Sequence, residues 1–219
     1  MFWQEEENPE HFVVPDRIVD LVFSIDCKTL PVDHAQALSD AIMDVLPWFV
    51  DEPESGMHAI HVAESGNGWM RPDDAGDTLY LSRRTKMTLR LPKERVADAL
   101  KLTGHTLMVA GNSLRVGEGK VKLLSNTSTL YARFMSSPAG ESEEVFLRRV
   151  VQEMRELGLK FKKVIAGKEN VVATHDGPLV TRSLMVGDLK SEDAIALQES
   201  GLGSHRKLGC GLFIPHKSV

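Results

Sequence analysis

The order in which strand-like and helix-like patterns alternate constrains the fold of this chain more than any other feature of its sequence. Residues 17–30 alternate apolar and polar side chains with a period of two, which predicts a strand. After Pro31, residues 33–46 carry apolar side chains at the helical period, with Asp33 as the expected N-cap, and Pro47 ends this helix. The patterns then predict strands over 57–63 and 78–91, a helix over 92–102, and strands over 105–109 and 115–124.

The second half of the chain shows a similar but less regular order of elements, and no sequence repeat is visible. A strand-like segment at 130–135 precedes a long amphipathic helix at 142–157, and Ser191 is the expected cap of a short helix ending near Glu199. The remaining expected strands cover 161–165, 171–174, 179–186 and 210–214. Strand, helix, strand, strand, helix, strand is the order of a ferredoxin-like fold. We therefore predict an α+β chain of two tandem ferredoxin-like domains, residues 1–125 and 126–219, with antiparallel sheets and helices on one face of each.

Charge is distributed unevenly along the chain. Residues 1–77 hold 3 basic and 17 acidic residues, whereas residues 78–219 hold 23 basic and 14 acidic residues. Polyanion binding depends on local basic surface and not on the net charge of −5, so the second part of the chain permits RNA binding. Two differently solvated surfaces would explain the asymmetry as well.

The composition also limits the compartment and the class of protein. Two cysteines are too few for a disulfide scaffold or a cysteine-built zinc site. No apolar stretch is long enough to span a bilayer, and the acidic residues of the N-terminus are unlike a signal peptide. We expect a cytoplasmic protein with no membrane partner.

Residues 201–211 form a glycine-rich segment with the strongest binding signal in the chain. Two Gly-x-Gly pairs flank five residues, and the backbone N–H groups of such turns can surround a phosphate. The segment follows a helix and lacks Gly-Lys-Ser/Thr, which excludes a dinucleotide-binding loop and a P-loop. A plain turn with exposed basic residues is the other interpretation. The expected RNA contacts are Gly201, Gly203, Ser204, His205, Arg206, Lys207, Gly209 and Gly211.

Three further stretches share a family pattern with this segment. They are Pro31-Val32-Asp33-His34-Ala35-Gln36-Ala37-Leu38, Leu46-Pro47-Trp48, and Leu81-Ser82-Arg83-Arg84-Thr85-Lys86 with Leu89-Arg90-Leu91-Pro92. Together with the glycine pattern, they resemble the CRISPR repeat-RNA processing endoribonucleases of the RAMP superfamily, in particular the Myxan-type branch. The resemblance implies binding of the CRISPR repeat hairpin and one cut per repeat in precursor CRISPR RNA. It also implies 2′,3′-cyclic phosphate and 5′-hydroxyl ends, formed without a metal or another cofactor.

Metal-free RNA cleavage needs a base for the 2′-hydroxyl, an acid for the leaving oxygen and a cation for the charged transition state. His34 is our first candidate, because the start of a helix favours a neutral imidazole and because the resemblance implies a histidine at this helix. The alternative is a partly buried histidine that hydrogen-bonds a neighbouring loop. His58 is the candidate second proton-transfer group, with an ordinary strand residue as the alternative, and Lys86 is the candidate cation.

Two basic regions are candidate phosphate contacts. Arg83 and Arg84 precede Lys86 on one predicted strand. The other region lies on and after the 142–157 helix and contains Arg148, Arg149, Lys160, Lys162 and Lys163, where a hairpin RNA could lie. Solvated surfaces are the alternative for both.

Other chemistries lack their patterns in this sequence. We find no carboxylate cluster for a two-metal nuclease and no nucleophile elbow. No strand carries the paired aromatic residues of an RNA recognition motif, so base stacking is not expected to dominate RNA binding. Two functions remain as alternatives to the endoribonuclease: a non-catalytic RAMP-fold subunit that holds guide RNA within a CRISPR effector complex with other subunits, and a scaffold whose glycine loop binds protein.

Overall fold

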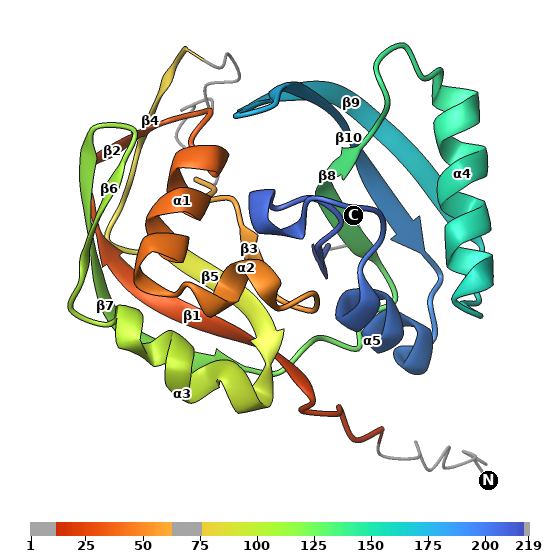
Figure 1. Cartoon of the computed structure of the whole chain (residues 1–219). Coiled ribbons are helices and arrows are strands. Elements are labelled where there is room, and N and C mark those ends of the chain that lie inside the picture. The colour runs from red at the N-terminus through yellow and green to blue at the C-terminus, as the bar shows by residue number, and fades with distance from the viewer. Residues whose placement is uncertain (1–11, 63–75, 217–219) are drawn as a thin grey trace, which may run out of the picture.

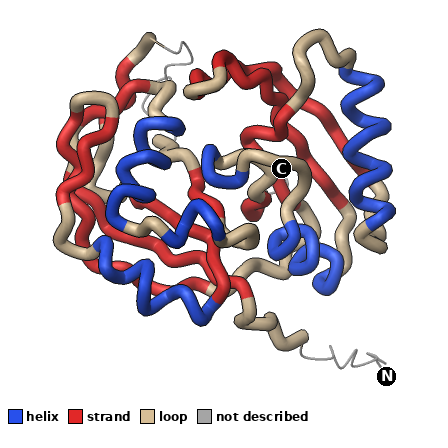
Figure 2. Tube along the Cα trace, in the orientation of Figure 1, coloured by secondary structure: helices blue, strands red, loops and turns tan. Residues whose placement is uncertain are grey.

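The computed structural model describes residues 12–62 and 76–216. Its strands form a five-stranded sheet from the N-terminal half, a four-stranded sheet from the C-terminal half and a small two-stranded sheet. Helices lie beside each of the two large sheets (Figure 1, Figure 2). The last strand of the five-stranded sheet ends at Lys122 and the first strand of the four-stranded sheet begins at Leu130.

The N-terminal sheet has the strand order β3-β5-β1-β7-β6, with all neighbours antiparallel. Alternation along β1 buries Leu21 and Phe23 on one face, as the period-two pattern predicts. The strands of this sheet are β1 (Ile18–Asp26), β3 (Gly56–His58), β5 (Lys86–Pro92), β6 (Thr106–Val109) and β7 (Asn112–Lys122).

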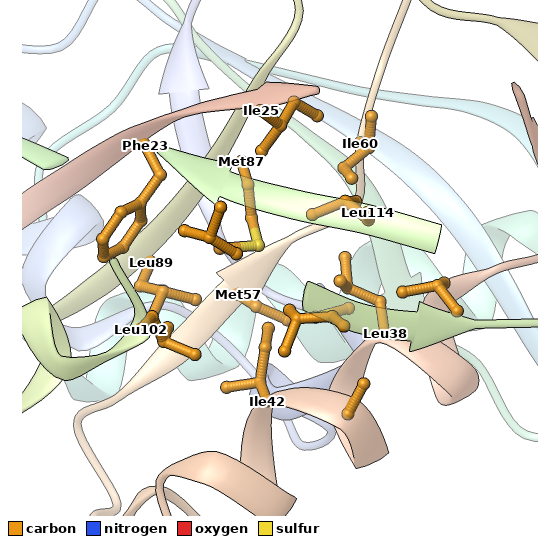
Figure 3. Close-up of a cluster of buried hydrophobic side chains, with 14 of the residues drawn as sticks. Phe23, Ile25, Leu38, Ile42, Met57, Ile60, Met87, Leu89, Leu102 and Leu114 are labelled. Atoms are coloured by element: carbon orange, nitrogen blue, oxygen red, sulfur yellow. The ribbon is translucent and has the colours of Figure 1, made fainter. Parts of the chain in front are cut away.

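Helix α1 (Ala35–Val45) covers one face of this sheet. Leu38 and Ile42 of α1 are buried in a single core with Phe23, Met57 and Leu89 of the strands (Figure 3). The helix that we predicted over 92–102 is a short α-turn, α3 (Val96–Ala99), between the 3₁₀ turns η1 (Lys93–Arg95) and η2 (Leu100–Leu102). A further turn of helix, α2 (Trp48–Asp51), follows α1.

The C-terminal sheet has the strand order β11-β8-β10-β9, again antiparallel. Its elements are β8 (Leu130–Ser136), α4 (Glu143–Glu156), β9 (Lys163–Thr174), β10 (Gly177–Gly187), α5 (Ser191–Ser200), the 3₁₀ turn η3 (Arg206–Leu208) and β11 (Phe213–Pro215). Helix α4 buries Phe146, Val150 and Met154 against this sheet, and α5 adds Ala194 and Leu197 to the same core. Both helices therefore cover one face, and the predicted α+β, ferredoxin-like architecture is confirmed.

Several predicted boundaries are wrong. The strand predicted over 78–91 is interrupted by a turn, because Thr85 N–H bonds to the Ser82 carbonyl; its first part, β4 (Thr78–Tyr80), leaves the main sheet and pairs with β2 (Thr29–Pro31). The strand predicted over 57–63 ends at His58. The two strands predicted between 161 and 174 are one long strand, β9.

Two predicted helix caps also differ from the structure. His34 occupies the N-cap position of α1, whereas the Asp33 carboxylate accepts a hydrogen bond of 2.8 Å from the backbone N–H of Ala173 in the other half. Ser191 is the first residue of α5 and Lys190 is its N-cap. Ser142 does cap α4, since its hydroxyl accepts from the N–H of Val145.

A buried arginine joins the two halves. Arg90 on β5 is fully buried and donates two hydrogen bonds to the Asp20 carboxylate, at 2.9 and 3.0 Å. Its Nη1 donates to the backbone carbonyls of Phe213 and Gln198 in the C-terminal half, at 2.7 and 3.2 Å.

No helix among the described residues has the length and apolar character needed to cross a bilayer.

Candidate functional site

The glycine-rich segment, residues 201–211, forms a compact loop between α5 and β11. Its four glycines all have positive φ, between 61° and 86°, as their spacing predicts. Gly211 is the most constrained, because a Cβ atom there would lie 1.9 Å from the Leu202 carbonyl oxygen. Its N–H bonds to the carbonyl of Phe134 on β8, and the Leu202 N–H bonds back to the Gly211 carbonyl. The loop is thus folded on itself and tied to the C-terminal sheet.

Arg206 and Lys207 are partly buried and donate to backbone carbonyls, so their predicted role in RNA binding stays a prediction. Arg206 Nη2 donates to the carbonyl of Glu54 at 3.0 Å, and Lys207 Nζ donates to the carbonyl of Ser55 at 2.6 Å. Lys207 Nζ also lies 4.5 Å from the ring centroid of Phe49. Burial lowers the pKa of Arg206 to about 10 and the pKa of Lys207 to about 8, and the repulsion of neighbouring cations adds to both effects. These two cations fasten the loop to the N-terminal half.

The exposed part of the loop is the turn Gly203-Ser204-His205. His205 itself takes the left-handed conformation, with a φ of 66°. Ser204 Oγ lies 2.8 Å from His205 Nδ1 and 3.4 Å from Ser136 Oγ at the end of β8. Of the eight loop residues predicted to contact RNA, these three present their side chains or backbone to solvent, whereas Gly201, Gly209 and Gly211 are buried.

His34 lies at the start of α1 and is buried, with 2% of its surface exposed. Nδ1 lies 2.8 Å from the Pro31 carbonyl and 3.0 Å from the Val32 carbonyl, and Nε2 accepts a hydrogen bond of 3.0 Å from the N–H of Ile60. Carbonyl oxygens only accept, so the proton resides on Nδ1 and the lone pair on Nε2. The imidazole has the neutral form that a general base needs, but its Nε2 is engaged by the backbone after β3.

His58 lies in the seam between the two halves, and its predicted catalytic role stays a prediction. Its Nε2 is 3.6 Å from Asp20 Oδ1, beside the Arg90 side chain. Burial lowers the pKa of His58 more than Asp20 raises it, and the charges of Arg90 and Arg133 lower it further. His58 is therefore explained as a member of a buried interdomain cluster.

Lys86, Arg83 and Arg84 do not share one strand face. Lys86 begins β5 and is exposed opposite Ser24; because its neighbour Met87 points into the core under α1, Lys86 lies on the face of the sheet away from α1. Arg83 and Arg84 are exposed at the tip of the turn before β5. The structure therefore does not bring Lys86 together with His34, and all three cations are available to solvent.

The second basic region is only partly free to contact RNA. Arg149 is held by the carboxylates of Glu141 and Glu153 and donates to the carbonyl of Ser136, so its predicted role as an RNA contact stays a prediction. Arg148 is exposed but pairs with Glu144 one turn earlier. The exposed lysines of this region are Lys160, Lys162 and Lys163, the last of which pairs with Asp188 at 3.2 Å.

The β9–β10 hairpin contacts the N-terminal half at the start of α1, and the sequence did not predict this contact. Val172 is buried in the core of the N-terminal half, and Ala173 N–H bonds to Asp33, the residue before His34. At the hairpin tip, His175 Nε2 lies 2.9 Å from Asp40 Oδ2. About 140 residues separate these partners in the chain, so no local pattern marks them.

Among the described residues, no group of three or more His, Cys, Asp or Glu side chains could hold a metal ion.

Comparison with known proteins identifies the family. The Cas6 family, described as "Cas6 Crispr", matches residues 19–218, which is most of the chain. This chain belongs to the Cas6 family. It is also similar to a protein of Myxococcus xanthus (strain DK1622) named CRISPR-associated endonuclease Cas6, with 29% identity over 197 residues, 90% of this chain and 81% of that protein. The predicted family resemblance is confirmed.

Solved structures of Cas6, Cas6-related and RAMP proteins share the fold. A structure described as CRISPR associated protein Cas6 superposes with a TM-score of 0.61 at 10% identity and covers 91% of this chain and 100% of its own. A RAMP protein described as binding different RNA substrates has a TM-score of 0.63 at 14% identity, covering 90% of this chain and 98% of its own. A Cas6-related protein from Pyrococcus furiosus has a TM-score of 0.60 at 11% identity, with 90% and 97% covered. At these identities the likeness shows the two-sheet architecture.

Proposed function

We propose that this Cas6 chain is an endoribonuclease that binds CRISPR repeat hairpins and cleaves precursor CRISPR RNA once per repeat, in the cytoplasm. The observation that carries the proposal is the family match across residues 19–218, supported by a relative named as a CRISPR-associated endonuclease. The exposed turn Gly203-Ser204-His205 supplies backbone N–H groups beside positive-φ glycines, as phosphate binding requires. Exposed Arg83, Arg84, Lys160, Lys162 and Lys163 would add phosphate contacts.

The proposed reaction is metal-independent attack by the 2′-hydroxyl on the adjacent phosphorus. A base removes the 2′-proton, the bond to the 5′-oxygen breaks, and that oxygen takes up a proton. The products are a 2′,3′-cyclic phosphate and a 5′-hydroxyl end. We propose His34 as the base, because its Nε2 carries the lone pair.

Catalysis by His34 requires one local change. Nε2 now accepts from the N–H of Ile60, and the ring is buried. For Nε2 to reach a 2′-hydroxyl, the backbone at Ile60 must release it when RNA binds. The Pro31 and Val32 carbonyls can keep their bonds to Nδ1–H and so hold the ring in the required tautomer.

Cleavage of the repeat RNA in EDTA tests this proposal. The wild type, a His34→Ala variant and a His34→Asn variant are incubated with the repeat RNA, and with the same RNA carrying a 2′-deoxy nucleotide at the cut site. We expect cleavage by the wild type alone and none of the deoxy substrate. Cleavage by both variants at the wild-type rate would remove His34 from the reaction, and cleavage of the deoxy substrate would exclude 2′-hydroxyl attack.

The burial of His34 also favours a second candidate function. A RAMP-fold subunit that holds guide RNA without cutting it needs no free histidine, and His34 then only fixes the segment at Ile60 to the start of α1. Tight binding of repeat RNA without cleavage by the wild type would support this function. It would also make association with other subunits of a CRISPR complex the next question.

A further inference from the structure

An aromatic and cationic cluster lies on the face of the C-terminal sheet that α4 and α5 leave uncovered. One row of side chains crosses all four strands of this sheet in register: Ile214, Tyr131, Met185 and Ile165. The next row, Phe213, Ala132, Leu184 and Ala166, packs into the core under α4 and α5. Because successive residues of a strand point to opposite faces, the row with Tyr131 faces away from these helices.

This row keeps contact with solvent. Ile165 is 51% exposed, and Tyr131, Met185 and Ile214 are each partly exposed. Helix α4 lies on the side of the sheet turned away from the N-terminal half (Figure 1), so it does not shield them. An apolar, partly exposed strip with a tyrosine at its centre is a surface on which a flat ring can lie.

Two side chains complete the cluster around Tyr131. The ring of His216, which follows β11, lies 5.7 Å from the Tyr131 ring at an interplanar angle of 54°. The guanidinium of Arg133 lies 6.0 Å from the centre of the Tyr131 ring. The backbone N–H of His216 donates to the Thr129 carbonyl at 3.0 Å, which fixes this residue beside β8. Tyrosine, histidine and arginine are the side chains on which unpaired bases stack.

Cations for the RNA backbone lie on the neighbouring face of the N-terminal sheet. Lys122 stands opposite Asp20 and Lys120 opposite Val22, and both lysines are exposed. Asp20 adjoins His58, and Arg133 is close enough to His58 to repel its protonated form. The uncovered faces of the two sheets therefore meet near Arg133.

We propose that Tyr131, with Arg133 and His216, is a stacking site for an unpaired nucleobase of the bound RNA. This inference rests on the proposed RNA-binding function and names the part of the RNA concerned, a single-stranded nucleotide outside the repeat hairpin. A protein segment would also cover an apolar strip, but the arginine and histidine beside the ring and the lysines on the adjoining sheet favour a polyanion with flat bases. Along β8, Tyr131 lies five residues from Ser136, roughly 17 Å at the rise of a strand, and Ser136 contacts Ser204 of the exposed glycine-loop turn.

Substitution of Tyr131 tests the site, and the chain supplies a matched control. Tyr80, the other tyrosine, is 65% exposed on β4 of the other half. Binding of repeat RNA is measured by fluorescence anisotropy for Tyr131→Ala, Tyr131→Phe and Tyr80→Ala. We expect Tyr131→Ala to weaken binding by about 5- to 100-fold, the range for loss of one stacked base. Tyr131→Phe keeps the ring and stays within about twofold of the wild type, and Tyr80→Ala has no effect.

A base analogue reports stacking directly. With 2-aminopurine placed in turn at each unpaired position of the RNA, the wild type and Tyr131→Phe quench one position that Tyr131→Ala leaves bright. Tyr131→Leu preserves an apolar side chain in the row, and it must show the same loss if Tyr131→Ala proves unstable. Wild-type affinity in Tyr131→Leu, with no position-specific change in quenching, overturns the inference while the proposed nuclease stands. A wild type that binds the RNA with this quenching but does not cleave it leaves the stacking site in place and refutes the nuclease. A wild type that does not bind the RNA overturns both.

Discussion

Replacing Arg90 by methionine is expected to destabilise the protein more than any exposed substitution, because Arg90 links the two halves through buried polar groups. Its guanidinium makes two bonds to Asp20 and two to backbone carbonyls of the C-terminal half. Removing one partner of a buried ion pair costs about 3–5 kcal/mol, since the other charge is left without compensation. For a chain of this length, that loss corresponds to a fall in Tm of about 6–20 °C.

The measurement is urea unfolding, followed by circular dichroism, for wild type, Arg90→Met, Asp20→Asn and the double variant. The double variant removes both charges of the pair, so we expect it to be more stable than the sum of the single losses predicts. Lys93→Met is the control, because Lys93 and Asp16 form a mostly exposed pair and its loss should not change stability measurably. A loss below about 1 kcal/mol in Arg90→Met, or strict additivity in the double variant, would refute the reasoning.

The Arg90–Asp20 pair also makes the stability of the folded state depend on pH in the acid range. Burial raises the pKa of the Asp20 carboxyl, but the charge of Arg90 and the contact with His58 outweigh burial and hold that pKa well below its usual range. The folded state therefore binds this proton less tightly than the unfolded state. The stabilisation is fully present above the unfolded pKa of about 3.9 and is lost as the pH falls below it towards the folded pKa. In Arg90→Met the acid transition should move to higher pH.

Three further predictions concern the glycine loop and the catalytic candidate. Gly211→Ala should destabilise the protein strongly, because the new Cβ would lie 1.9 Å from the Leu202 carbonyl oxygen. Gly140 also has a positive φ, but a Cβ there would meet no atom within 4 Å, so Gly140→Ala should lower the free energy of unfolding by only about 1 kcal/mol in thermal unfolding. The pKa of Lys207 is lowered to about 8, so the unfolded state binds the Lys207 proton more tightly than the folded state. The free energy of unfolding should therefore rise between pH 8 and 10 relative to that of Lys207→Met. Parallel pH profiles for the two proteins would contradict this. His34→Asn should abolish cleavage but keep repeat-RNA affinity within about threefold, since the proposed RNA contacts lie elsewhere and only the proposed base is lost. A matching loss of affinity would indicate a structural role.

The order of elements could be predicted from the sequence because it depends on local periodicity. The positive φ of the loop glycines followed in the same way from residue type. The direction of Arg206 and Lys207 could not be predicted, because the carbonyls that they bind belong to residues 54 and 55, about 150 positions earlier. The pairing of Tyr131 with His216 was missed for the same reason: the two residues lie far apart in the chain, and the sheet assembles the cluster from β8 and the residue after β11.

The charge asymmetry of the sequence therefore overstates the number of basic side chains that are free to contact a polyanion. Arg90, Arg206 and Lys207 belong to the basic second part of the chain, but they donate to carbonyls across the seam between the halves, so we expect them to release no counterions on RNA binding. The exposed cations Lys120 and Lys122 can do so. If they contact phosphates, replacing either by methionine should reduce the salt dependence of log K by about 0.7 for a single-stranded contact. Lys207→Met should lower stability and leave this slope unchanged. An equal reduction of the slope by Lys207→Met would show that the loop opens on binding and that Lys207 contacts the RNA, the contact predicted from the sequence.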